Sequence, residues 1–276
     1  MEARLMKSLK KAIVKLEAFF LDRETRPGVL ARQAVGKEKP GDAKLAELLC
    51  QERRARTRMD GSIGDSLFDT AWAAWEMMDL GLDALDGGLD RLISWVLSKI
   101  EAGDAVALPS PAPAPAPAPF PLTLPSGLVL PAAGDAAYAT RAIAVRTLVR
   151  ARHGERPGVA AAVRGLAQGP QPPTLNLSAS VLGALALAPP EHRHHLDGLI
   201  GRLGAAQGDD GGWPGADLFQ MLEALVLAGI RPARALIAKA VPALVPLQRE
   251  TGAFDDPPHE ERALIGLRAL LVAAED

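Results

Sequence analysis

The sequence predicts an all-α protein assembled from repeated helical hairpins. Apolar residues recur with the period of a helix along most of the chain, and glycines and prolines fall between these stretches, where turns are needed. One turn-like stretch recurs, with Gly211 and Gly252 separated by 41 residues, a period typical of arrays of one supersecondary unit. The chain is 48% hydrophobic but only 4% aromatic, so we expect a core mainly of Ala, Leu and Val, which suits closely packed helices.

The apolar periodicity predicts eleven helices. Ser66 precedes one of them as an N-cap, and Pro232 stands in the first turn of another. Pro242 and Pro246 fall inside the tenth predicted helix and should kink or end it. A twelfth helix would have to lie within residues 28–40 or in the interruption described next. The predicted helices cover residues 3–22, 42–57, 66–80, 87–101, 135–152, 157–167, 175–187, 191–206, 216–228, 232–248 and 259–274.

Residues 109–125 interrupt the helical pattern. Proline alternates with alanine along this stretch, which ends in a short apolar tail. Alternating Pro and Ala favours extended polyproline II and is incompatible with a helix. We therefore expect a single domain over residues 1–276 with a Pro/Ala-rich surface insertion at 109–125, which serves either as a spacer or as a docking segment.

The recurring stretch carries a resemblance to a known superfamily. Residues 207–213 and 248–254 both read Q-x-x-x-G-x-aromatic, and a looser relative runs from Gln51 to Ile63. This pattern resembles the QW motif of the terpenoid cyclase and protein prenyltransferase superfamily. The resemblance implies an α/α toroid, in which helix pairs surround an apolar central cavity. It also implies that Gln207 and Gln248 cap helix ends and stack on the rings of Trp213 and Phe254, so we expect a structural role for all four.

A second segment points to the same superfamily. Residues 66–74, Ser-Leu-Phe-Asp-Thr-Ala-Trp-Ala-Ala, are similar to the S-x-Y-D-T-A-W-V-A segment of diterpene cyclases of the copalyl diphosphate type. The resemblance implies a class II-like terpene cyclase, an isomerase-type enzyme that starts cyclisation of a linear isoprenoid diphosphate by protonating it. Such a reaction needs a carboxylic acid held neutral in a dry pocket.

The acid motif of that family is incomplete in this chain. The family supplies its acid as D-x-D-D at the start of an inner helix, and this sequence contains no D-x-D-D. Asp69, followed by Thr-Ala, and Asp217 both align with the last Asp of the motif, but the middle Asp, the family's proton donor, is missing from both. The favoured alternative for each carboxylate is a structural role at a helix N-terminus, where the macrodipole stabilises negative charge. Whether the protein is an enzyme therefore stays open, with Asp69 and Asp217 as the catalytic candidates.

Aromatic and basic residues complete the predicted substrate site. Ring faces stabilise carbocations through cation–π attraction, although helical spacing in an ordinary core gives the same pattern. The resemblance implies that basic side chains bind the diphosphate, with Mg²⁺ as a possible bridging ion and no required cofactor. The candidate substrate-binding residues are Phe68, Trp72, Trp75, Tyr138, Arg141, Arg146 and Phe219.

Zinc chemistry of the protein prenyltransferase kind is not expected. That branch uses D-x-C after a Gly-Gly turn, whereas here Asp217 is followed by Leu218 and Phe219, so the thiolate is missing. Cys50, the single cysteine, belongs to a predicted amphipathic helix and excludes an intramolecular disulfide.

Charge and hydropathy restrict the remaining function classes. The 31 basic and 33 acidic residues are interspersed, which argues against nucleic-acid binding. The first 21 residues are amphipathic, unlike a signal peptide, and no apolar stretch is long enough to predict a transmembrane segment, so we expect a cytoplasmic protein. The alternative to a cyclase is a non-catalytic toroid that binds a lipid or a partner protein, and either form could act with a second toroid domain or as a homodimer.

Overall fold

The protein is all-helical. The computed structural model describes residues 2–103, 121–192, 194–257 and 259–275. Within them the chain forms twelve α-helices, two short 3₁₀ helices and one two-stranded sheet. The helices are α1 (Glu2–Phe20), α2 (Arg26–Ala34), α3 (Asp42–Arg56), α4 (Leu67–Asp79), α5 (Gly87–Glu101), α6 (Ala133–Arg150), α7 (Pro157–Gln168), α8 (Leu175–Leu185), α9 (His194–Ala206), α10 (Leu218–Ala228), α11 (Arg231–Leu244) and α12 (Glu260–Glu275).

The eleven predicted helices are present, and the twelfth is α2. This short helix begins at Arg26, where the hydroxyl of Thr25 caps it by accepting a hydrogen bond from the Gly28 amide at 3.3 Å. The predicted end of the tenth helix is found at the second of its two prolines. The α-helix α11 continues past Pro242 to Leu244, and a 3₁₀ turn, η2 (Val245–Leu247), contains Pro246.

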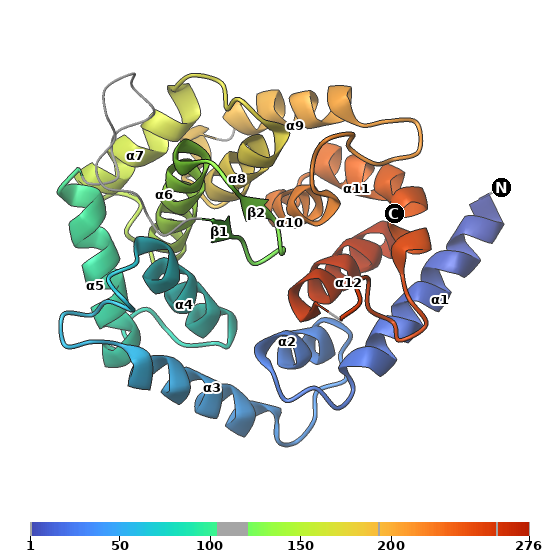
Figure 1. Ribbon diagram of the computed structural model, residues 1–276, viewed down its shortest axis with the longest axis horizontal. Helices are drawn as coiled ribbons and strands as arrows, with labels where there is room; N and C mark the ends of the chain where they lie inside the picture. Colours follow the sequence, from blue (N-terminus) through green and yellow to red (C-terminus); the bar gives the residue numbers. More distant parts are fainter. Residues whose placement is uncertain (1, 104–120, 193, 258, 276) are drawn as a thin grey trace.

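The helices form two layers around the middle of the molecule (Figure 1). The even-numbered helices α4, α6, α8, α10, α12 and α2 pack against one another in that order, and the odd-numbered helices lie outside them. Helix α1 packs on α12, so the first and last helices of the chain are neighbours. Small buried residues such as Ala71 and Ala74 in α4 and Ala139 in α6 allow the inner helices to approach closely.

Three loops between an odd and an even helix share one turn geometry. In each, the amide of the turn's first residue donates to the carbonyl four residues later at 2.8 Å: Arg58 to Ser62, Gly208 to Gly212, and Arg249 to Ala253. These turns join α3 to α4, α9 to α10, and α11 to α12. The degenerate early copy of the repeat is therefore a structural equivalent of the other two.

The glycine of each turn lies against the next outer helix. Gly61, Gly211 and Gly252 have φ angles of +93°, +88° and +94°. A Cβ at any of the three would collide with a backbone carbonyl oxygen, in Arg91 of α5, Lys239 of α11 or Lys15 of α1. Only glycine combines this backbone conformation with so close an approach. The glycine therefore has the same role in all three turns, which is to let the turn pack against a helix.

In the later two copies the glutamine and the ring have the structural role that the QW resemblance implied, while stacking of the glutamine on the ring stays a prediction. The Gln207 amide donates to the Gly211 carbonyl at 2.9 Å and to a carbonyl of α11 at 3.0 Å, while Trp213 donates to the Leu203 carbonyl at 2.8 Å. Gln248 donates in the same way to Gly252 and to a carbonyl of α1. The early copy does not use Gln51, which is exposed on α3.

A small hairpin lies across the centre of the even-numbered helices (Figure 1). Strands β1 (Leu122–Thr123) and β2 (Val129–Leu130) pair antiparallel, with Leu122 opposite Leu130. We call residues 122–130 the central hairpin. Residues 104–120 lie outside the described part of the chain, and they include residues 109–120 of the predicted 109–125 insertion. Its last residues enter the central hairpin, where Leu124 is buried instead of lying on the surface.

Candidate functional site

The even-numbered helices enclose a small central cavity of about 40 Å³. Its walls come from α2, α4, α10 and α12, together with Pro125 of the central hairpin. A cavity of this size holds only a few water molecules. The side chains that surround it therefore decide what the centre of the protein can bind.

Two tryptophans of α4 line the cavity, and arginines lie over both indole rings. The Arg26 guanidinium is 5.2 Å from the Trp72 ring centroid, and that of Arg146 is 5.8 Å from it. Arg146 also lies 4.1 Å from the Trp75 ring, and Arg150 lies 4.3 Å from the same ring. These contacts form a continuous arginine–tryptophan cluster that joins α2, α4 and α6.

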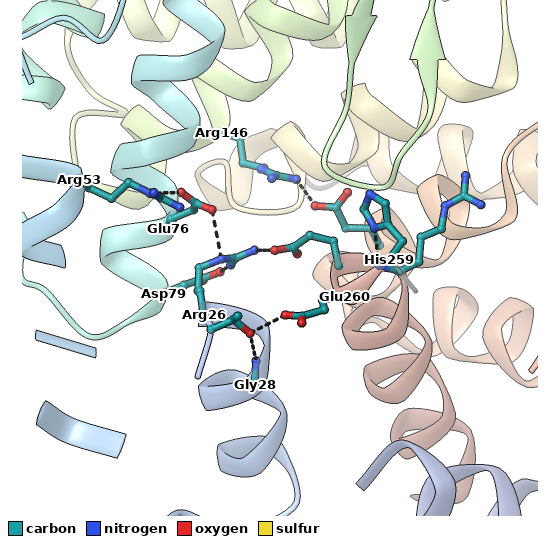
Figure 2. A network of polar contacts seen from close by, with 12 residues as sticks. Arg26, Gly28, Arg53, Glu76, Asp79, Arg146, His259 and Glu260 are labelled. Carbon is teal, nitrogen blue, oxygen red and sulfur yellow. Dashed lines mark hydrogen bonds and ion pairs between the residues drawn. The ribbon is translucent and has the colours of Figure 1, made fainter. Parts of the chain in front are cut away.

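Carboxylates of three helices neutralise these arginines, as Figure 2 shows for Arg26. Arg26 pairs with Asp79 at 2.6 Å, with Glu76 at 3.4 Å and with Glu261 of α12. Asp79 also accepts from Arg150 at 2.5 Å. Separate pairs join Arg146 to Glu223 of α10 at 3.0 Å and Arg53 of α3 to Glu76 at 2.7 Å. The network thus ties α2, α3, α4, α6, α10 and α12 together.

Burial determines the electrostatics of this network. Desolvation opposes the charge of Arg26, but Glu261, Asp79 and Glu76 outweigh it and hold the pKa of Arg26 above its ordinary value. Burial raises the pKa of the Glu261 carboxyl, against the opposing effect of Arg26. Burial also lowers the pKa of Arg268, another guanidinium that lines the cavity. Burial thus favours the neutral form of the Glu261 carboxyl.

A second, larger groove of about 280 Å³ lies beside the cavity, between α2, α3 and α4. Arg26 and Glu261 line both spaces, so their ion pair forms part of the wall between them. Beside this groove, the ion pairs of Arg26 with Glu76 and Asp79 join α2 to α4, whose backbones do not pack closely.

The structure brings three predicted substrate-binding residues together. Trp72 and Trp75 line the central cavity, and Arg146 lies over both rings. Phe68 is buried one turn earlier on α4 but is not among the residues that line the cavity.

The two predicted catalytic carboxylates lie elsewhere. Asp69 is exposed in the first turn of α4, where its amide donates to the Ser66 hydroxyl at 3.1 Å. Asp217 is the N-cap of α10: it accepts from the Gln220 amide at 2.8 Å and pairs with Arg262 at 2.8 Å. Burial raises the pKa of the Asp217 carboxyl, but neither acid lines the central cavity.

The remaining candidates occupy other parts of the core. The Arg141 guanidinium lies beside Gly165 of α7 and is not among the groups that line the cavity, and burial lowers its pKa. Tyr138 is buried, and burial raises its pKa. Phe219 packs 5.2 Å from the ring of Phe254, with the Arg262 guanidinium 5.0 Å from its centroid. Phe219 therefore stabilises the α10–α12 contact instead of lining the cavity.

The acidic residues that pair with Arg26 were not predicted from the sequence. Glu76 and Asp79 follow Trp72 by four and seven residues, so the spacing places all three on one face of α4. That spacing could have predicted the acidic residues of α4 from the sequence. No sequence pattern could have predicted the pair of Arg26 and Glu261, because these residues lie 235 positions apart in the chain.

Comparison with known proteins identifies no family for this chain. No protein-family model matches it, and no curated protein does either. Among the described residues, no group of three or more His, Cys, Asp or Glu side chains is placed to hold a metal ion. None of the helices in the same residues has the length and apolarity needed to cross a membrane.

Proposed function

We propose that the twelve helices close into a single α/α toroid of the kind seen in terpenoid cyclases. The equivalent turns support this arrangement. Gly61 packs on α5 and Gly211 on α11, in each case the next outer helix along the chain. Gly252 makes the same contact with α1, the first helix. In a closed ring α1 is the next outer helix after α11, so one rule accounts for all three contacts.

We further propose that this toroid is a non-catalytic binding protein for an apolar small molecule. The observation that carries the proposal is the occupation of both indole rings by guanidinium groups. A carbocation needs an accessible ring face, and here Arg26, Arg146 and Arg150 already make those contacts at 4.1–5.8 Å. A nearby positive charge would also repel a developing carbocation.

The carboxylates of the cavity support the same proposal. A proton donor to an alkene must turn its acid group toward the substrate, whereas these carboxylates are held in ion pairs with arginines. Asp79 has two arginine partners, and Glu223 has one. Asp69, the residue that best matches the cyclase segment, is exposed to solvent.

A class II-like terpene cyclase is the second candidate, and one observation favours it. Glu261 borders the cavity, and burial raises the pKa of its carboxyl against the opposing effect of its partner Arg26, a direction that favours a neutral acid. It also lies in the first turn of an inner helix, the location of the acid motif in the family that the sequence resembles. In this alternative Glu261, rather than Asp69 or Asp217, protonates the substrate.

One experiment separates the two candidates. The purified protein is incubated with linear isoprenoids, their alcohols, diphosphates and epoxides, with and without Mg²⁺. Binding is measured by thermal shift and tryptophan fluorescence, because Trp72 and Trp75 line the cavity, and products are measured by mass spectrometry.

We expect binding without conversion. A cyclised product that disappears in Glu261→Gln and persists in Asp69→Asn would establish the cyclase instead. If no compound binds or reacts, both small-molecule functions fail and a partner protein, including a second toroid, becomes the remaining ligand.

A further inference from the structure

The tip of the central hairpin fills the middle of the ring of inner helices. Leu124 and Leu130 are 3% and 4% exposed, and Ser126 is fully buried. Pro125 forms part of the wall of the central cavity, beside Trp72 and Trp75. The small size of that cavity is therefore partly a consequence of the hairpin's position.

Two polar contacts anchor the tip to the inner helices. The Ser126 hydroxyl donates to Oε1 of Gln220 on α10 at 2.9 Å. The Ser126 carbonyl accepts from Nε of Arg262 on α12 at 2.5 Å. The tip thus presents one hydrogen-bond donor and one acceptor to the helices, with apolar side chains on both sides of it. A small alcohol group offers the same pair of functions.

The charged side chains around Ser126 favour a neutral ligand group over an anionic one. Arg262 is already paired with Asp217 at 2.8 Å and with Asp255 at 3.1 Å. His259 lies beside Gly127, and burial lowers its pKa, which favours the neutral imidazole. Two carboxylates therefore already pair with this guanidinium, and a diphosphate placed there would have to compete with them for it.

The hairpin itself has little internal structure. Its two strands contain two residues each, and Gly127 adopts a φ of +79° in the turn. A two-stranded hairpin is at best marginally stable on its own, so its position depends on the contacts with the helices. A segment of this kind can leave the core without unfolding the elements around it.

We propose that the tip of the central hairpin occupies a ligand site, and that the site takes a neutral amphiphile with a hydroxyl head group. The hydroxyl replaces Ser126 between Gln220 and Arg262, and the apolar body fills the space that Leu124 and Pro125 vacate beside Trp72. The inference deepens the proposed binding function and rests on it. It predicts that an isoprenoid alcohol binds better than the corresponding diphosphate.

Cysteine labelling tests whether the hairpin opens. Cys50, the single cysteine, is buried and is replaced by alanine. In that background Ser126→Cys reports the tip, and Ser178→Cys, equally buried on α8, is the matched control for global unfolding. Without ligand, we expect a soluble thiol reagent to label Cys at position 126 at least ten times faster than at position 178. Equal rates would overturn the proposal, whether or not any ligand binds.

Ligand arms test the chemistry of the site. Geranylgeraniol should accelerate labelling at position 126 at least threefold without accelerating it at 178, and geranylgeranyl diphosphate should act at least tenfold more weakly. Gln220→Ala should accelerate labelling at position 126, because the tip loses its contact with Gln220, and should also weaken binding of the alcohol, because the alcohol loses the same contact. A residue that only stabilises the fold would not produce both effects. Opening without binding of the alcohol, or stronger binding of the diphosphate, refutes the proposed site. Binding detected by thermal shift with no change in labelling refutes it while leaving the proposed function intact.

Discussion

Substitution of Gly252 tests directly the proposed closure of the helices into a ring. Gly252 has a φ of +94°, and a Cβ there would collide with the carbonyl oxygen of Lys15 on α1. Gly252→Ala therefore combines backbone strain of about 1–2 kcal/mol with displacement of the turn from α1. Displacement also breaks the hydrogen bond from Gln248 to the Ala12 carbonyl, worth about 1 kcal/mol, and partly exposes Phe254.

We expect a total loss of about 4 kcal/mol for Gly252→Ala, on the scale of measured effects of strain and lost packing. Gly36→Ala is the matched control, because Gly36 also has a positive φ, +66°, but a Cβ there would have no neighbour within 4 Å. That control should lose only the strain, about 1 kcal/mol. Gly211→Ala, whose Cβ would collide with α11, should resemble Gly252→Ala.

The assay is urea unfolding followed by circular dichroism at 222 nm, with the free energy of unfolding obtained for all three variants. If Gly252→Ala loses no more stability than Gly36→Ala, the last turn does not press on α1. The ring would then be open between its first and last hairpins, and the reasoning from the equivalent turns would fail.

Three further changes test the packing, the buried charges and the pH dependence. Trp213→Ala should cost about 3 kcal/mol by urea unfolding, because it removes a buried ring and its bond to Leu203, while a neutral result would mean that the ring contributes nothing. Arg26→Met should cost about 3–5 kcal/mol, and adding Glu261→Leu should restore part of this loss; no recovery would contradict the assigned pair. The Arg32 hydrogen bond holds the pKa of Asp42 below its ordinary 3.8, so the carboxylate stabilises the fold above pH 3.8 and loses that effect as pH falls through the lower folded-state pKa. The stability gap between wild type and Asp42→Asn should therefore be constant above about pH 5 and shrink below pH 3.8, and a pH-independent gap would contradict this.

Local chemistry made most of the helices predictable. Ser66 caps α4 and Pro232 stands in the first turn of α11, as the sequence indicated. The short helix α2 overlaps one of the two stretches in which a twelfth helix was expected, but the sequence did not decide between them, because the stability of α2 comes from burial and ion pairing. Its first residue, Arg26, is 5% exposed and pairs with residues of α4 and α12. No pattern within a window of the sequence contains those partners.

The recurring turn was visible in the sequence because its requirements are local. A positive φ needs glycine, and a buried ring and an amide at fixed spacing recur with it, so residues 207–213 and 248–254 could be matched by inspection. The early copy is harder to recognise in the sequence, because Thr57 and Ile63 stand where the other copies have the glutamine and the ring. Gln51 lies too far before the turn to take part in it.

What the sequence determined, then, is the set of helices, their caps and the turn that repeats between them, since each depends on residues a few positions apart. Only the tertiary structure decided what occupies the centre. Trp72 and Trp75 suggested an apolar cavity for a cation, yet Arg26, Arg146 and Arg150 fill that role from other helices. The central hairpin reaches the same place from an insertion whose composition suggested a surface segment. Burial and pairing of charges are set by contacts between distant parts of the chain, and such contacts are fixed only when the chain folds.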